Sequence, residues 1–239
     1  MKRFVSFFIT LLCLCAGRSG AQDIYLVSAG VTDYPGTRMD LTHPADDAKA
    51  LYRLYKKNAH SVTAVLLTDS NATKGHILQE MRRLYNKAKP DDIVVFFFSG
   101  HGFQGGFVPY DDYLTYDEIR RVFSQCKAKN KMIFADACFS GDLREGGRMG
   151  QSDPINNVML FLSSRSNEVS IESRDMKNGF FTACLLRSLK GGADTDRNRV
   201  ITAKELFKAV SEGVKQLSKD RQHPVMWGNF DDNMPVMVW

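Results

Sequence analysis

Two apolar runs, each ending in small, turn-forming residues, constrain the fold of this chain more than any other feature. The runs are IVVFFFSGHG at residues 93–102 and MIFADACFSG at residues 132–141. Continuous stretches of branched and aromatic residues are typical of parallel strands buried on both faces. Open α/β sheets bind ligands at the carboxyl ends of such strands, so the two runs are expected to bring His101 and Cys138 to one cleft. This pair indicates a cysteine nucleophile assisted by a histidine.

Strand patterns alternate with helix patterns along the chain. Strands are predicted over residues 24–31, 62–67, 93–98, 132–135 and 158–162. Helices are predicted over residues 44–58, 73–88, 115–124, 179–189 and 202–217, and the third and fifth start with a Thr-x-x-Glu capping box. This alternation indicates a parallel sheet covered by helices on both faces, and 239 residues suit a single domain of this class.

The first 21 residues have the layout of a signal peptide. Lys2 and Arg3 precede an apolar stretch over residues 4–16, and small residues lead up to Ala21. We expect residues 1–21 to be removed, which leaves residues 22–239 as a secreted or periplasmic domain. A retained anchor stays an alternative, but the apolar stretch is too short to span a membrane as a stable helix. No stable membrane insertion is expected after leader removal.

The charge of the mature chain argues against one class of partner, and its cysteine count predicts a free thiol. The leader carries three basic residues and no acidic one, so its loss lowers the formal net charge from +5 to +2. No basic run interleaved with aromatic residues remains, which argues against nucleic acid. The mature chain keeps Cys126, Cys138 and Cys184, and an odd number in an oxidising compartment implies at least one unpaired thiol. A disulfide between Cys126 and Cys184 stays open.

Glycines and one aspartate mark the ends of the two apolar runs. Gly100 and Gly102 flank His101, and they allow the backbone to turn tightly and approach a substrate. Asp136 closes an apolar strand, where a buried carboxylate costs several kcal/mol unless it is paired. A charged ligand would supply the partner.

At these residues the sequence resembles the caspase and metacaspase clan of cysteine peptidases. The resemblance rests on the SGHG and DACFSG motifs in this order, and it extends to ADDA at residues 45–48, Pro109-x-Asp111, GFFT at residues 179–182 and QHP at residues 222–224. Together with the leader, it suggests a secreted bacterial member. It implies a caspase-like three-layer α/β sandwich, in which a mainly parallel sheet of about six strands carries helices on both faces.

The resemblance also implies a mechanism. Cys138 attacks the scissile carbonyl as a thiolate, while His101 protonates the leaving amine and then activates water. The backbone N–H groups of Gly102 and Cys138 hold the oxyanion. This chemistry requires neither a metal nor a cofactor.

Three further residues match a metacaspase specificity pocket, namely Asp47, Ser99 and Asp136. Caspases that cut after aspartate have glutamine in place of Asp136, and their pocket arginine is replaced here by Leu41. Two carboxylates favour a guanidinium or ammonium group, so the expected substrates are peptides or proteins with Arg or Lys before the scissile bond. In the alternative interpretation, Asp47 caps its helix and Asp136 accepts backbone N–H bonds.

The glycine-rich stretch over residues 141–157 is predicted to be a mobile surface loop. It contains Arg144 and Arg148, which the expected pocket would accept, and exposed loops are favoured sites of cleavage. Self-cleavage after Arg144 or Arg148 is one hypothesis, and a loop that is never processed is the other.

Residues 194–205 have the ligand spacing of a calcium loop. Asp194, Asp196, Asn198 and Glu205 fill the first, third, fifth and twelfth positions. The sixth position is Arg199, where such loops require glycine. A turn leading into a capped helix is therefore favoured, and calcium is expected to be dispensable.

Two alternatives of other classes remain. A catalytically inactive caspase-like module for peptide binding or scaffolding is disfavoured by the presence of both His101 and Cys138. A generic doubly wound ligand-binding protein is disfavoured because no G-x-G-x-x-G motif follows the first strand. The sequence carries no signal for the natural substrate or the oligomeric state.

Overall fold

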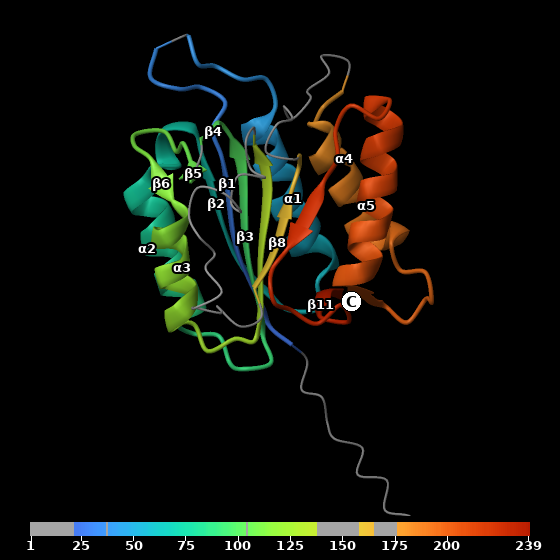
Figure 1. Ribbon diagram of the computed structural model, residues 1–239. Helices are drawn as coiled ribbons and strands as arrows, with labels where there is room; N and C mark the ends of the chain where they lie inside the picture. The colour runs from blue at the N-terminus through green and yellow to red at the C-terminus, as the bar shows by residue number, and fades with distance from the viewer. Residues whose placement is uncertain (1–21, 37, 104, 138–157, 165–175) are drawn as a thin grey trace, which may run out of the picture.

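A six-stranded sheet forms the centre of the molecule, in the order β10-β8-β7-β3-β1-β2 (Figure 1). The computed structural model describes residues 22–36, 38–103, 105–137, 158–164 and 176–239. Neighbouring strands are parallel, except for the antiparallel pair of β10 and β8. The strands are β1 (Ile24–Gly30), β2 (Val62–Thr68), β3 (Ile93–Gly100), β7 (Asn130–Ala137), β8 (Val158–Leu162) and β10 (Val225–Trp227). The expectation of a mainly parallel sheet of six strands is confirmed.

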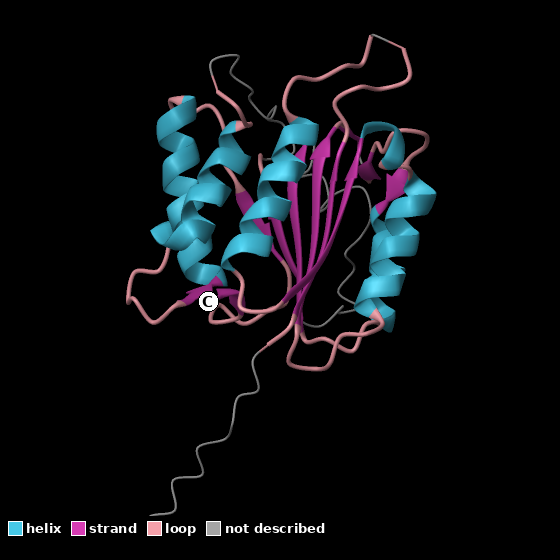
Figure 2. Cartoon of the chain, turned by 180° about the vertical axis from the view of Figure 1, so that it is seen from behind, coloured by secondary structure: helices cyan, strands magenta, loops and turns pink. Residues whose placement is uncertain are grey.

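Helices cover both faces of this sheet, as Figures 1 and 2 show. One face carries α1 (Pro44–Asn58), α4 (Phe180–Arg187) and α5 (Ala203–Ser218), whose buried residues share one hydrophobic cluster. The other face carries α2 (Lys74–Tyr85) and α3 (Tyr116–Gln125), whose buried residues belong to a second cluster. The predicted three-layer α/β architecture is therefore present.

Strand β3 runs through the middle of the sheet, and all eight of its residues are buried. Phe96 and Phe98 lie in the cluster under α2 and α3, whereas Phe97 lies in the cluster under α1, α4 and α5. Successive side chains of a strand point to opposite faces, so Ser99 follows Phe97 onto the side of α1. This alternation decides which helices can contact the end of the strand.

Most predicted elements match the structure to within three residues. The capping boxes at Thr115 and Thr202 are both present, and Thr73 caps α2 by accepting a hydrogen bond from the His76 N–H. The helix predicted over residues 179–189 is shorter than expected. It ends at Arg187 and continues as the π-helical turn η3 (Ser188–Gly192), in which Gly191 has a φ of 108°.

Several short elements were not predicted, because two or three residues carry no clear periodicity. A three-stranded sheet contains β4 (Gly102–Phe103), β5 (Gly106–Phe107) and β6 (Leu114–Thr115). A two-stranded sheet pairs β9 (Val200–Thr202) with β11 (Pro235–Val238). One 3-10 turn, η1 (Asp69–Asn71), precedes α2. Among the described residues, no helix has the length and apolar character needed to cross a membrane.

Candidate active site

His101 directly follows β3 at the carboxyl edge of the sheet. The strand register pairs Gly100, the residue before His101, with Ala137 at the end of β7. Cys138 is the next residue after Ala137, and it lies outside the described residues, as do the predicted signal peptide and both Arg144 and Arg148. The two predicted catalytic residues thus follow paired positions on adjacent parallel strands.

The imidazole of His101 is oriented by two contacts. Its Nε2 atom lies 2.7 Å from the carbonyl oxygen of Met39, and its ring lies 4.9 Å from the Tyr34 ring, centroid to centroid. A hydrogen bond to a carbonyl oxygen requires the proton on Nε2, so in the neutral ring Nδ1 carries the lone pair. The site therefore favours the tautomer in which Nδ1 is the base. Neither Met39 nor Tyr34 was singled out from the sequence.

Gly102 opens the short strand β4 and pairs with Phe107 of β5. It is the residue directly after His101 in the sequence. Its role in holding an oxyanion together with the Cys138 N–H stays a prediction.

Asp47 and Ser99, two of the three predicted pocket residues, are in direct contact. Asp47 is only 1% exposed, and its Oδ2 atom accepts a hydrogen bond of 2.9 Å from the Ser99 hydroxyl. Its Oδ1 atom accepts a bond of 2.7 Å from the side-chain amide of Asn178. These bonds join α1 to the end of β3 and to the residue two positions before α4. Asn178, which was not predicted from the sequence, therefore joins the residues expected to form the specificity pocket.

Asp136 lies on the strand next to Ser99, because the register of β3 and β7 pairs these two residues. It is 7% exposed, and its Oδ2 atom accepts bonds from the Thr182 N–H (3.1 Å) and the Thr182 hydroxyl (2.8 Å). Asp136 therefore satisfies one of the unpaired N–H groups at the start of α4. The expected backbone hydrogen bond of the alternative interpretation is present for Asp136.

One short segment, residues 178–182, contacts the carboxylates of both Asp47 and Asp136. Asn178 donates to Asp47, and Thr182, four residues later, donates to Asp136. Between them, Gly179 packs so closely that a Cβ atom there would lie 2.6 Å from the Asp136 Oδ2. The start of α4 and Asn178 before it thus contact both carboxylates and help to fix where each of them lies.

The remaining cysteines are poor nucleophile candidates. Cys126 and Cys184 are both free and buried, so the possible disulfide between them is not formed. Burial raises the pKa of the Cys184 thiol to about 11, and it raises the pKa of Cys126 as well. A thiol with a raised pKa carries little of the reactive thiolate at neutral pH.

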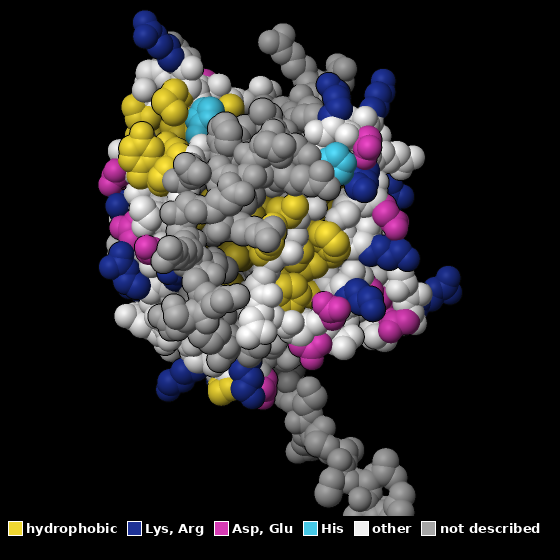
Figure 3. Space-filling model, viewed as in Figure 1, with side chains coloured by type: hydrophobic (Ala, Val, Ile, Leu, Met, Phe, Trp, Pro, Cys, Tyr) yellow, Lys and Arg dark blue, Asp and Glu magenta, His cyan; other side chains and the backbone are white. Residues whose placement is uncertain are grey.

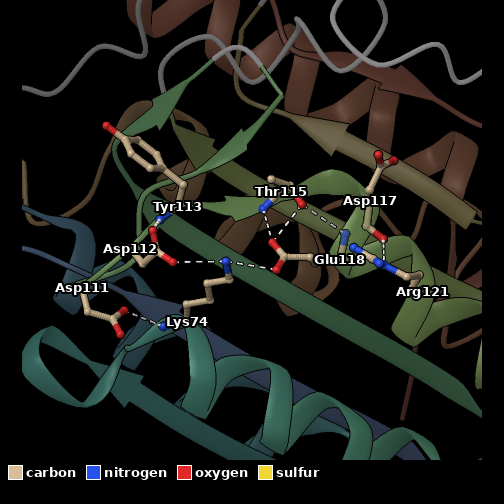
Figure 4. A network of polar contacts seen from close by, with 8 residues as sticks. All are labelled: Lys74, Asp111, Asp112, Tyr113, Thr115, Asp117, Glu118 and Arg121. Carbon is tan, nitrogen blue, oxygen red and sulfur yellow. Dashed lines mark hydrogen bonds and ion pairs between the residues drawn. The ribbon is translucent and has the colours of Figure 1, made fainter.

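A polar network anchors the chain segment that follows β5 (Figure 4). The Lys74 ammonium lies 3.2 Å from Asp112 and 3.0 Å from Glu118, while the Lys74 N–H donates to Asp111. The network joins the start of α2, this segment and the start of α3. It gives the Asp111 motif a structural role, because it fixes the segment that begins beside His101.

Hydrophobic side chains gather on the surface over the small β4–β5–β6 sheet (Figure 3). Tyr113, 58% exposed, packs edge to face on Phe103 at a centroid distance of 4.9 Å. Its backbone N–H donates to Asp112, so the Lys74 network holds this surface aromatic residue in place.

Asp194, Asp196 and Glu205 form a cluster of carboxylates within the described part of the chain. One ligand atom of each lies within 4.8 Å of the others, which is close enough to hold a cation. Their oxygens also accept hydrogen bonds from within the loop, including two from the Asn198 N–H. Arg199 takes a left-handed backbone with a φ of 66°, so the sharp turn forms without glycine. This geometry agrees with the capped turn favoured from the sequence.

Comparison with known proteins gives three findings. The caspase domain family matches residues 28–234. Metacaspase-1 from Candida albicans is 32% identical over 111 residues, which span 44% of this chain and 23% of that protein. Two solved structures share the fold at 16% identity: a protein from Geobacter sulfurreducens (TM-score 0.66, covering 86% of this chain and 92% of that one) and caspase-1 from Spodoptera frugiperda (TM-score 0.65, covering 87% of each).

Proposed function

Because this chain belongs to the caspase domain family of cysteine peptidases, we propose that it is an active endopeptidase that cleaves proteins after Arg or Lys. One observation carries the specificity. Asp47 and Asp136 are two buried carboxylates that accept hydrogen bonds from Ser99, Asn178 and Thr182 at the end of β3, the strand that His101 follows. Two carboxylates at this edge of the sheet favour a guanidinium or ammonium group on the substrate.

In the proposed reaction, Cys138 transfers its proton to Nδ1 of His101 and its sulfur forms a bond to the scissile carbonyl carbon. The N–H groups of Gly102 and Cys138 stabilise the resulting oxyanion. The imidazolium then protonates the leaving amine as the C–N bond breaks. Water next attacks the acyl group, passes a proton to His101 and releases the sulfur. Throughout, the Met39 carbonyl keeps the Nε2 proton in place.

The experiment measures hydrolysis of three fluorogenic peptides that differ only in the residue before the reporter: Arg, Lys or Asp. We expect cleavage of the first two and none of the third, because two carboxylates repel an acidic side chain. Cys138→Ala should abolish hydrolysis, while Cys126→Ala, which removes a buried thiol elsewhere, should keep it. Cleavage after Asp would contradict the pocket assignment. Full activity of Cys138→Ala would contradict the nucleophile.

Self-processing is a second part of the proposal. Arg144 and Arg148 follow Cys138 closely in the sequence and are residues that a basic-specific pocket accepts. Wild-type protein and Cys138→Ala are incubated side by side, and new amino termini are sequenced. A cut after Arg144 or Arg148 in wild type alone supports self-cleavage. The same pattern in both proteins would rule it out.

We also propose that residues 1–21 direct export and are removed. The basic start, the apolar stretch and the small residues up to Ala21 support this assignment. Sequencing the amino terminus of protein recovered outside the cytoplasm should give Gln22 first. Recovery of intact protein starting at Met1 from a membrane fraction would indicate a retained anchor instead.

A further inference from the structure

We propose that Tyr34 is a positioning residue, whose hydroxyl group holds the main chain of His101 in the geometry needed for proton transfer. The inference rests on the proposed peptidase function, and it concerns a residue to which the proposed mechanism gives no role. Tyr34 lies in the loop after β1, and it reaches His101 across 67 positions of sequence.

The Tyr34 hydroxyl makes two hydrogen bonds at the base of the catalytic residue. It accepts a bond of 2.9 Å from the His101 N–H, and it donates one of 2.9 Å to the Val108 carbonyl. The Val108 N–H in turn donates to the His101 carbonyl at 2.9 Å. Both main-chain groups of His101 are therefore bound, one by Tyr34 and one by Val108, and Tyr34 also binds Val108.

The Tyr34 hydroxyl is buried and stays protonated. Tyr34 is 4% exposed, and burial raises the pKa of its hydroxyl well above the usual value for tyrosine, so the group keeps its proton and can donate to Val108. Gly100 leaves room for it, since a Cβ there would lie 2.8 Å from the Tyr34 oxygen. A glycine before His101 is thus required partly by the hydroxyl beneath it.

The same tyrosine also contacts the imidazole. Its ring lies 4.9 Å from the His101 ring at an angle of 45°, while the Met39 carbonyl binds the Nε2 atom. The main chain, ring face and ring edge of His101 are thus all constrained. Removing the hydroxyl alone breaks the bond to the His101 N–H and the bond that ties Tyr34 to Val108. A displacement of about 1 Å at a catalytic group can lower a rate by about a hundredfold.

The test compares Tyr34→Phe with Tyr85→Phe. Tyr85 is a matched control. Its buried hydroxyl donates a bond of 2.7 Å to the carbonyl of Val95, which lies in β3 six residues before His101. Each variant keeps its ring and loses the bonds of one buried hydroxyl. Both are assayed on the Arg peptide at a temperature at which circular dichroism shows both folded. We expect Tyr34→Phe to lower kcat by about tenfold or more with KM within about twofold, and Tyr85→Phe to change neither.

A second readout requires no substrate. Alkylation of Cys138 by iodoacetamide is followed against pH in both variants, in protein that starts at Gln22 and therefore lacks Cys13 and Cys15, with Cys126 and Cys184 replaced by Ala so that only one thiol reacts. A well-placed imidazolium lowers the pKa of the thiol, so Tyr34→Phe should shift the alkylation profile to higher pH, whereas Tyr85→Phe should not. A merely structural role would lower thermal stability in both variants and leave both profiles unchanged.

The outcomes separate the two proposals. Wild-type protein that cleaves none of the peptides contradicts the proposed function. Active wild-type protein with kcat and alkylation profile unchanged in Tyr34→Phe overturns the positioning role alone, as do equal losses of kcat in the two variants.

Discussion

Asp136 leaves room for nothing larger than glycine at position 179. The Cβ of an alanine there would lie 2.6 Å from the carboxylate oxygen that binds Thr182, so either Asp136 or the start of α4 would have to move. Gly179 therefore determines where the Asp136 carboxylate lies, and under the proposed function this affects specificity indirectly.

We predict that Gly179→Ala lowers kcat/KM for the Arg peptide and destabilises the fold by about 1–3 kcal/mol, the usual range for overpacking. Gly75→Ala is the matched control, because it lies in α2 with nothing within 4 Å of an added Cβ. It should leave activity unchanged and raise stability by up to about 1 kcal/mol. Thermal unfolding and peptide kinetics on the three proteins test this. Equal activity in all of them would show that Asp136 tolerates displacement.

At this scale, the sequence allows prediction of residues that end strands or start helices. Ser99 and Asp136 follow apolar runs, and Asp47 begins a helix, so motif and position agree. Asn178 and Tyr34 could not be found in this way. Their contacts span 131 and 67 positions, and no local pattern encodes which loop residue reaches a site from that far along the chain.

The Lys74 network joins three elements, and its carboxylates make it sensitive to acid. A hydrogen bond from the Tyr113 N–H and the contact with Lys74 lower the pKa of Asp112. Burial alone would raise the pKa of Glu118, but its hydrogen bonds from Thr115 and Lys74 together lower it. A carboxyl whose pKa is lowered on folding stabilises the protein above its unfolded pKa, and that contribution is lost as the pH falls.

We predict that Lys74→Met weakens this acid dependence. Wild-type Tm should fall steeply as the pH drops from about 6 to about 3, through the usual pKa values of 3.8 for Asp112 and 4.5 for Glu118. Lys74→Met should have a lower Tm at neutral pH and a shallower decline. Lys49→Met, which removes an exposed pair with Asp46 at 3.1 Å, serves as the control and should follow the wild-type curve. Identical slopes for Lys74→Met and wild type would contradict the role of the network.

The elements themselves were predicted to the degree that their patterns repeat. β3, with eight residues, and α1, with fifteen, give clear signals, and the bounds of α1 and β8 agree with the prediction. β4, β5 and β6 have two residues each, and they form only because the chain returns on itself after His101. Their pairing depends on tertiary contacts, such as the stacking of Phe107 on Phe98 at 4.8 Å.

At the scale of the whole molecule, the described residues form two hydrophobic cores that share one sheet. One lies under α2 and α3, and the other lies under α1, α4 and α5. His101 and the carboxylates of the proposed pocket depend on both, because Asp47 comes from α1 whereas Tyr34, which binds His101, packs in the core under α2 and α3. Since β3 supplies alternate side chains to each core, we expect the two layers to unfold together.

The two tryptophans allow this to be tested, since the chain has only Trp227 and Trp239. Trp227 packs against the core under α2 and α3, and Trp239 packs against the other core. Each is replaced by Phe in turn in the Cys138→Ala protein, which cannot cut itself during heating. Fluorescence of either tryptophan should give the same Tm. Phe97→Ala, which removes a ring from the core next to Trp239, costs about 3–5 kcal/mol and should lower the Tm by about 10 °C for both reporters. A shift confined to Trp239 would mean that the layers unfold separately, and that loss of the pocket need not entail loss of the histidine site.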